Sequence, residues 1–200
     1  MGAKVSLPIA DNVLRLLGFN PVTLITSVDK EGAVNTAPHG WVSIVDYNPP
    51  QLVLSVNVKH DTYRNILEAG EFVVNIPSAD LIGEIWITQK HFPYGTSELE
   101  EAGLTTLPSD KVKPPRIKEC KAHLECKVLW TNIIGSACLV LGSIEAISVD
   151  EEMEKLDAKE QAIALNRLIF LSYESERIFC LPQQNPLPPE YLRCGEIHQD

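Results

Sequence analysis

Short apolar runs with strand-like alternation recur along the first three quarters of the chain. Most are rich in β-branched residues and are bounded by glycine, proline, asparagine or aspartate, which is typical of strands joined by turns. The pattern predicts strands over residues 22–28, 33–36, 41–47, 51–58, 71–76, 120–131 and 136–149. Because several neighbours in this series are joined by hairpin-length turns, we expect an antiparallel sheet that is closed, or nearly closed, into a barrel.

Helical spacing occurs between and after these runs. It predicts short helices over residues 11–17, after Asp61, and over 78–89. Asp157 and Glu160 have the spacing of a capping box, which predicts a helix that continues through Leu171.

Three segments are expected to be irregular. Residues 37–40 interrupt the ladder through Pro38. Residues 91–116 lack sustained periodicity and form either a surface excursion or a lid over a site. Residues 181–200 contain four prolines and are expected to wrap over a surface without regular structure.

The predicted fold class is therefore mainly β, an antiparallel barrel with inserted helices. A doubly wound parallel sheet is disfavoured because the chain has neither a G-x-G-x-x-G turn nor a Walker loop. With 200 residues, of which 44% are apolar, we expect residues 1–200 to form a single domain. Its core spans about residues 20–150, followed by a C-terminal helix and a proline-rich tail over 151–200.

Charge and cysteine content narrow the class of partner and the compartment. The formal net charge of −10 argues against a broad grip on nucleic acid or on an anionic membrane. Five cysteines without a C-x-x-C pair are typical of reduced thiols, which favours a cytoplasmic protein. No apolar run is long enough to span a bilayer.

The segment from Lys59 to Ile66 has the features of a phosphate site. It ends a predicted strand and opens a helix, where Asp61 or Thr62 can cap the first turn and where free N–H groups favour an anion. Lys59 adds a counter-charge. The same segment is equally typical of an ordinary capped helix with a solvated lysine.

Conventional catalytic and metal motifs are absent from the sequence. There is no G-x-S-x-G, no H-E-x-x-H and no histidine or cysteine pair at metal spacing, so we predict neither catalytic side chains nor a metal site. The segment from Asn35 to Ser43 combines hydrogen-bonding side chains, a backbone break and the indole of Trp41. It is suited to a flat heteroaromatic ring.

Several short motifs stand in an order that resembles a known family. They are Pro21-Val22 with Thr26, Asp29 and Gly32, Asn35-x-Ala37-Pro38-x-x-Trp41, Pro49-Pro50, Lys59, Thr62-x-x-Asn65-Ile66 and Glu71-Phe72-x-Val74-Asn75-Ile76-Pro77. Together they resemble the flavin reductase-like family of FMN-binding split barrels, which includes flavoredoxins and ferric reductases. The resemblance runs from about Pro21 to Val149.

The resemblance implies a homodimeric split barrel with one FMN per subunit near the dimer interface. Lys59, Thr62 and Asn65 match positions on the phosphate side. Further cofactor-binding positions match the edge of the isoalloxazine ring or its surroundings: Asn35, Thr36, Ala37, Trp41, Val42, Ser43 and Lys90.

One departure from the family pattern affects the expected reaction. Many members carry an Asp-His pair on the nicotinamide side of the pocket, where this chain has Ser136-Ala137. The leading hypothesis is an FMN-dependent oxidoreductase that takes electrons from NAD(P)H or a protein donor and passes them to flavin, ferric or protein acceptors. The alternatives are a non-catalytic FMN-binding electron carrier, which the departure favours, and a split barrel that has lost flavin and binds haem or another ligand.

Overall fold

The computed structural model describes residues 20–93, 96–165 and 167, the strands at 169–173, 176–182 and 194–196, and Ser6 and Pro8 near the N-terminus. The helix expected over residues 11–17 lies outside the described residues. Among the helices of this part of the chain, none is both long and apolar enough to cross a membrane.

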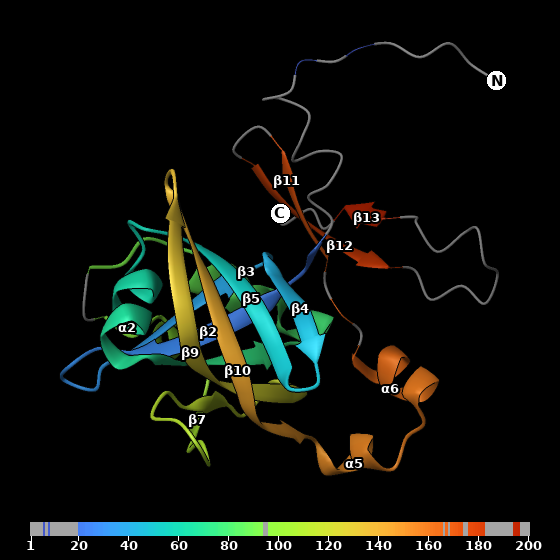
Figure 1. Cartoon of the computed structure of the whole chain (residues 1–200). Helices are drawn as coiled ribbons and strands as arrows, with labels where there is room; N and C mark the ends of the chain where they lie inside the picture. The colour runs from blue at the N-terminus through green and yellow to red at the C-terminus, as the bar shows by residue number, and fades with distance from the viewer. Residues whose placement is uncertain are drawn as a thin grey trace.

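The main body is a seven-stranded antiparallel sheet that curls without closing (Figure 1). Its strand order is β3-β2-β6-β9-β10-β5-β4. The strands are β2 (Thr23–Val28), β3 (Val34–His39), β4 (Val42–Tyr47), β5 (Pro50–Asn57), β6 (Glu71–Ile76), β9 (Ala122–Ile134) and β10 (Ala137–Val149). The open edges at β3 and β4 make this a split barrel, and the predicted fold class is confirmed.

Strand β3 continues through the segment where a break was expected. Pro38 pairs with Leu24 and His39 with Thr23, so the predicted interruption after Thr36 is wrong. The reason is the position of β3 at the edge of the sheet. Thr36 N–H bonds to a side chain outside the ladder, and the position two residues later faces the same way, so Pro38 removes no ladder hydrogen bond.

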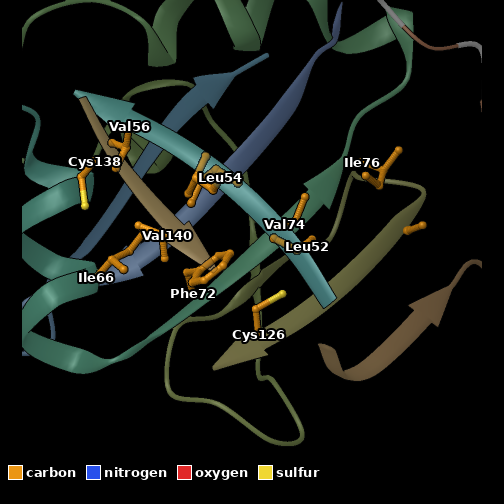
Figure 2. Packing of buried hydrophobic residues seen from close by; sticks show 12 residues of the cluster. Leu52, Leu54, Val56, Ile66, Phe72, Val74, Ile76, Cys126, Cys138 and Val140 are labelled. Carbon is orange, nitrogen blue, oxygen red and sulfur yellow. The ribbon is translucent and has the colours of Figure 1, made fainter. Parts of the chain in front are cut away.

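The principal core lies inside the curl of the sheet, where helix α2 (Asp61–Ala69) covers it. Figure 2 shows Phe72 between Leu52, Val140 and Cys126, with Ile66 of α2 nearby. All are almost completely buried. The amphipathic spacing of α2 places Ile66 inward because residues on one helix face recur every three to four positions.

A second apolar cluster fixes the short helices on the outer side of β2. These are the 3₁₀ helix η1 (Ala79–Leu81), α3 (Ile82–Thr88) and α4 (Glu98–Glu101). Leu99 of α4 packs with Leu24 of β2 and Ile85 of α3, and all three are buried. The first residues of the 98–104 segment are thus held to the sheet although the surrounding sequence lacks periodicity.

A buried carboxylate holds the basic loop between β7 (Thr106–Leu107) and β8 (Arg116–Ile117). Glu125 is 1% exposed and accepts hydrogen bonds from the backbone N–H groups of Asp110 and Lys111. A buried carboxylate without hydrogen-bond partners would destabilise the fold, and these N–H groups provide its partners. This segment is therefore an anchored surface excursion.

The C-terminal quarter differs from its prediction. Helix α5 (Glu151–Glu154) precedes α6 (Ala158–Leu165), which ends before the predicted limit at Leu171. The capping box at its start is confirmed, because Asp157 Oδ1 accepts from Glu160 N–H and Glu160 Oε2 accepts from Asp157 N–H.

Strands follow where helix and irregular tail were expected. A second sheet has the order β1-β11-β12-β13, formed by β1 (Asn20–Pro21), β11 (Ile169–Tyr173), β12 (Glu176–Pro182) and β13 (Cys194–Glu196). Figure 1 shows it beside the seven-stranded sheet. The run at 169–173 is short and rich in apolar side chains, and such a run fits a strand as well as a helix until its pairing partner is known.

Candidate functional site

A pocket of about 300 Å³ opens where the edge strand β3, the start of α2 and the end of α3 meet. This volume is at the lower end of the range typical of small-molecule sites. Five residues predicted from the sequence line it: Asn35, Ala37, Lys59, Thr62 and Lys90. The other lining residues are Pro38, His39, Asn57, His60, Asp61, Thr88, Gln89, His91, Phe92 and Glu98.

The start of α2 is built differently from its prediction. His60 is the N-cap and makes no side-chain capping bond, so the assignment of Asp61 or Thr62 as the cap is wrong. His60 has the extended backbone of a cap residue, whereas Thr62 already lies inside the first turn with its side chain buried. Lys59 stays exposed at the pocket rim, where its N–H bonds to Asn57 Oδ1 over 2.9 Å.

A buried polar network links α2 to the two strands behind the pocket. Thr62 Oγ1 donates to Asn35 Oδ1 over 2.9 Å, and Ser27 Oγ donates to the same oxygen over 3.3 Å. Asn65 Nδ2 in turn donates to Ser27 Oγ over 3.4 Å. Asn65 is therefore placed behind the pocket wall and does not line the pocket, while Ser27 is a network member that the sequence motifs did not single out.

Glu98 is the main site residue that sequence reasoning missed. Its Oε1 accepts from Asn35 Nδ2 over 2.8 Å and its Oε2 accepts from Thr36 N–H over 3.0 Å. Burial raises the pKa of this carboxyl above its ordinary value, and the bonds from Thr36 and Asn35 oppose that shift. The only sequence signal for α4 was Ser97 ahead of Glu98 and Glu100, a sequence typical of a helix N-terminus.

Besides Asn65, four further predicted residues lie outside the pocket lining. The Thr36 side chain is buried and its Oγ1 has no hydrogen-bond partner. Val42 and Ser43 begin β4, the strand at the other edge of the sheet, and Trp41, which directly precedes β4, is 48% exposed. Trp41 is tied to β5 through Ser55 N–H, which bonds to its carbonyl oxygen.

The position of the Ser136-Ala137 departure is close to the pocket. Ala137 pairs with Asn57, a lining residue, and Val58 N–H bonds to Ser136 O over 3.0 Å. His123 lies at the other end of β9, where it pairs with Asn75 and does not line the pocket. It therefore does not replace the missing histidine.

His123 instead has a structural environment. Its Nε2 lies 2.8 Å from Ile117 O and its Nδ1 lies 3.0 Å from Ser148 Oγ. Because a carbonyl oxygen only accepts, Nε2 carries the proton and Nδ1 accepts from the Ser148 hydroxyl. Burial lowers the pKa of this imidazole, which keeps it neutral.

The charges around the pocket are mixed. Lys59 and Lys90 contribute positive charge at the rim, and Asp61 and Glu98 contribute negative charge. Oδ1 of Asp61 lies 3.8 Å from Nη1 of Arg64. No group of three or more histidine, cysteine, aspartate or glutamate side chains in the described part of the chain could hold a metal ion.

This donor set fits a planar ring with an anionic tail. The two rim lysines are suited to a phosphate. The β3 edge and the carboxylate of Glu98 offer hydrogen-bond acceptors to the polar edge of a heteroaromatic ring. The hydrogen bonds of Asn35, Thr62 and Glu98 described above serve to bind and orient a ligand.

Comparisons with known proteins agree with this geometry. The model of the flavin reductase like domain matches residues 19–166. An uncharacterized protein of Aquifex aeolicus is 35% identical over 144 residues, which cover 70% of this chain and 74% of the relative. The crystal structure of nitrilotriacetate monooxygenase component B from Bacillus cereus has a TM-score of 0.81 and 29% identity, covering 94% of this chain and all of that one (100%).

A further structural neighbour shares the fold. Flavoredoxin from Methanosarcina acetivorans superposes with a TM-score of 0.77 at 24% identity, covering 94% of this chain and 96% of that chain.

Proposed function

The chain belongs to the flavin reductase-like family, whose members bind flavin, and on that premise we propose that it is an FMN-binding oxidoreductase. The observation that carries the proposal is the pocket that joins the β3 edge at Asn35 and Ala37 to the rim lysines Lys59 and Lys90. In this proposal the β3 edge holds the ring. Lys59 and Lys90 hold the terminal phosphate at the pocket rim.

The side chains of the pocket bind and orient, and the redox chemistry is the cofactor's. Bound flavin accepts a hydride or electrons and passes them on without a protein nucleophile. Asn35 is fixed by Ser27, Thr62 and Glu98, so the ring side of the site is preorganised before a ligand arrives. Lys59 is exposed and supplies charge at the entrance.

The proposed donor is NAD(P)H or a reduced protein, and the proposed acceptors are free flavin, ferric chelates or a protein. The similarity to a monooxygenase component B at 29% identity supports transfer of electrons toward an oxygenase partner. The small Ser136-Ala137 side chains beside Asn57 leave that part of the pocket without the Asp-His pair of many family members.

Two measurements test the proposal. Purified protein is expected to show a flavin spectrum after incubation with FMN, and to bind FMN more tightly than riboflavin, which lacks the phosphate. Steady-state oxidation of NADH and NADPH with an added acceptor then identifies the donor. A protein that binds neither FMN nor FAD would refute the assignment, and FMN binding without oxidation of either nicotinamide would point to a protein donor.

We further propose that a second copy of the chain covers an apolar surface formed by β4 and the β9–β10 hairpin. Beyond Lys127, β9 has no register partner in β6, and its apolar side chains are exposed. Large apolar side chains left exposed on neighbouring strands are typical of a surface that another chain covers. The exposed residues are Ile44, Val45 and Tyr47 on β4, and Leu129, Trp130, Ile133 and Ile134 on β9.

Light scattering after size exclusion tests the homodimer. The wild-type chain of 22.2 kDa is expected to elute with twice that mass, and Ile134→Asp is expected to shift it toward the monomer. Ile147→Asp on β10 is the matched control, since Ile147 is exposed but lies near the end of β10 that is remote from the hairpin turn. A monomeric wild type would refute the proposal.

The buried free thiols of Cys120, Cys126 and Cys138 support a reducing, cytoplasmic location.

A further inference from the structure

Glu98 differs from the other charged groups of the pocket in how firmly it is held. Lys59 and Lys90 are exposed at the rim, whereas Glu98 is half-buried with both carboxylate oxygens bonded to β3. A group fixed in this way keeps its charge at one place in the pocket. The negative charge of Glu98 therefore acts on a bound ligand from the same point of the pocket.

The helix that carries Glu98 is fixed by packing on the opposite side. Leu99 is buried in the apolar cluster around Leu24 and Ile85, and Leu104 N–H bonds to Leu99 O over 2.9 Å. Gly103 has a φ of 70°, a left-handed conformation that ends the helix. Residue 98 therefore points to β3 as a consequence of the anchoring of residue 99.

The hydrogen bonds of Glu98 match an ionised carboxylate. Its two oxygens each receive one N–H group, from Asn35 Nδ2 and from the Thr36 backbone. Ionised carboxylates only accept hydrogen bonds, so this geometry stabilises the charged form. Asn35 cannot turn its amide round without loss, because its Oδ1 already accepts from Thr62 and Ser27.

We propose that Glu98 is a positioning residue that also sets the reduction potential of the bound flavin: it orients Asn35 and places a fixed negative charge at the ring end of the pocket. This inference rests on the proposed flavin site. Two electrons and one proton added to a flavin leave the ring with one more negative charge than before. A fixed carboxylate in the same pocket disfavours that added charge, so the reduced flavin is a stronger electron donor.

The other charged and titratable groups of the pocket do not give the same effect. Lys59 and Lys90 have the opposite sign, and Asp61 lies within reach of Arg64. The three histidines of the lining cannot place a negative charge in the pocket, because an imidazole side chain is either neutral or positive. Glu98 is the lining carboxylate whose two oxygens both bond to the strand that carries Asn35.

The test compares the affinities of oxidised and reduced FMN. Glu98→Gln removes the charge and keeps one acceptor oxygen, but its amide N–H group faces one of the two donors, Asn35 Nδ2 or Thr36 N–H. Glu98→Ala is therefore the second variant, without that clash. Glu101→Gln removes the same charge from the exposed side of the same helix and is the matched control. The full-length proteins are titrated with FMN before and after anaerobic reduction, and the midpoint potential is measured against a reference dye.

Both Glu98 variants are expected to shift the ratio of the two dissociation constants about tenfold toward reduced FMN, the order of magnitude for unit charges within one pocket. The potential rises accordingly, while Glu101→Gln leaves the ratio within about twofold of wild type. Equal ratios in all four proteins would overturn the inference and leave the flavin site intact. A wild type that binds no flavin would overturn the proposed function and the inference together.

Discussion

The hydroxyl of Thr62 donates a hydrogen bond to Oδ1 of Asn35 over 2.9 Å, which joins the first turn of α2 to the edge strand β3. The two residues are 27 positions apart in the sequence and both are buried. The bond fixes one side of the pocket to the other. Thr62 thus acts on the site through Asn35 as well as through its place in the lining.

Replacing Thr62 by valine keeps the shape of the side chain and removes this bond. We expect the free energy of unfolding to fall by about 1 to 2 kcal/mol, because Asn35 Oδ1 loses its shorter partner in a buried setting. Urea denaturation followed by circular dichroism measures the change. Thr106→Val on an exposed strand is the control and is expected to shift the midpoint little.

Lys59→Ala removes an exposed positive charge from the pocket rim. We expect FMN binding to weaken by about 1.5 to 3 kcal/mol, the value of a charge-assisted contact, and riboflavin binding to stay unchanged because riboflavin has no phosphate. Quenching of flavin fluorescence measures both affinities. Lys155→Ala removes an exposed lysine outside the pocket and serves as the control. Equal weakening of FMN and riboflavin would contradict a phosphate role for Lys59.

Protonation of His123 is expected to make stability depend on pH. Burial lowers the pKa of this imidazole in the folded chain below its ordinary value of 6.5. The unfolded chain therefore binds a proton first as the pH falls, and stability rises with pH wherever the unfolded state holds more protons. The contribution is complete above about pH 6.5 and is lost as the pH falls from there toward the lowered pKa.

Denaturation midpoints between about pH 5 and 7.5 check this window. The raised pKa of Glu98 acts in the opposite direction, since that carboxyl contributes stability that is lost as the pH rises. The comparison of wild type with His123→Gln isolates the histidine. We expect the denaturation midpoint of the variant to fall less steeply toward low pH than that of the wild type. Identical slopes of midpoint against pH would show that His123 does not titrate on unfolding.

Gly142 lies directly under the ring of Phe72 in the core. A Cβ at this position would stand 2.9 Å from Cζ and 3.1 Å from Cε1 of Phe72. Overpacking of this kind costs about 1 to 3 kcal/mol, which is the loss we expect for Gly142→Ala in thermal or urea denaturation. The double variant with Phe72→Leu should cost less than the sum of the two single changes, because the shorter side chain vacates the space.

The sequence predicted the sheet because its strands carry their own signals. Alternating apolar positions and turn residues located β2, β4, β5, β6, β9 and β10, and the side chains of Asp157 and Glu160 located the start of α6. Such signals are local. Where local preference was balanced, as after Leu165, pairing between distant segments decided for strands and the predicted helix was too long.

The site was harder to predict for the same reason. Asn35, Ala37, Lys59, Thr62 and Lys90 were found from their order in the chain, and the structure brings them to one pocket. Glu98 lies in a segment without periodicity and reaches the pocket because Leu99 is buried against β2 and α3. The N-cap of α2 is His60, and Thr62 lies inside the first turn, where its hydroxyl bonds to Asn35.

The edge strand β3 also limits how copies of this protein can associate. Its outward positions at Thr36 and Pro38 offer no backbone donor, since Glu98 takes the first N–H and proline lacks the second. Another strand therefore cannot add to the sheet there by continuous hydrogen bonding, and such pairing is a common route to aggregation. The residues that shape the pocket wall thus also protect the sheet from growing on that side.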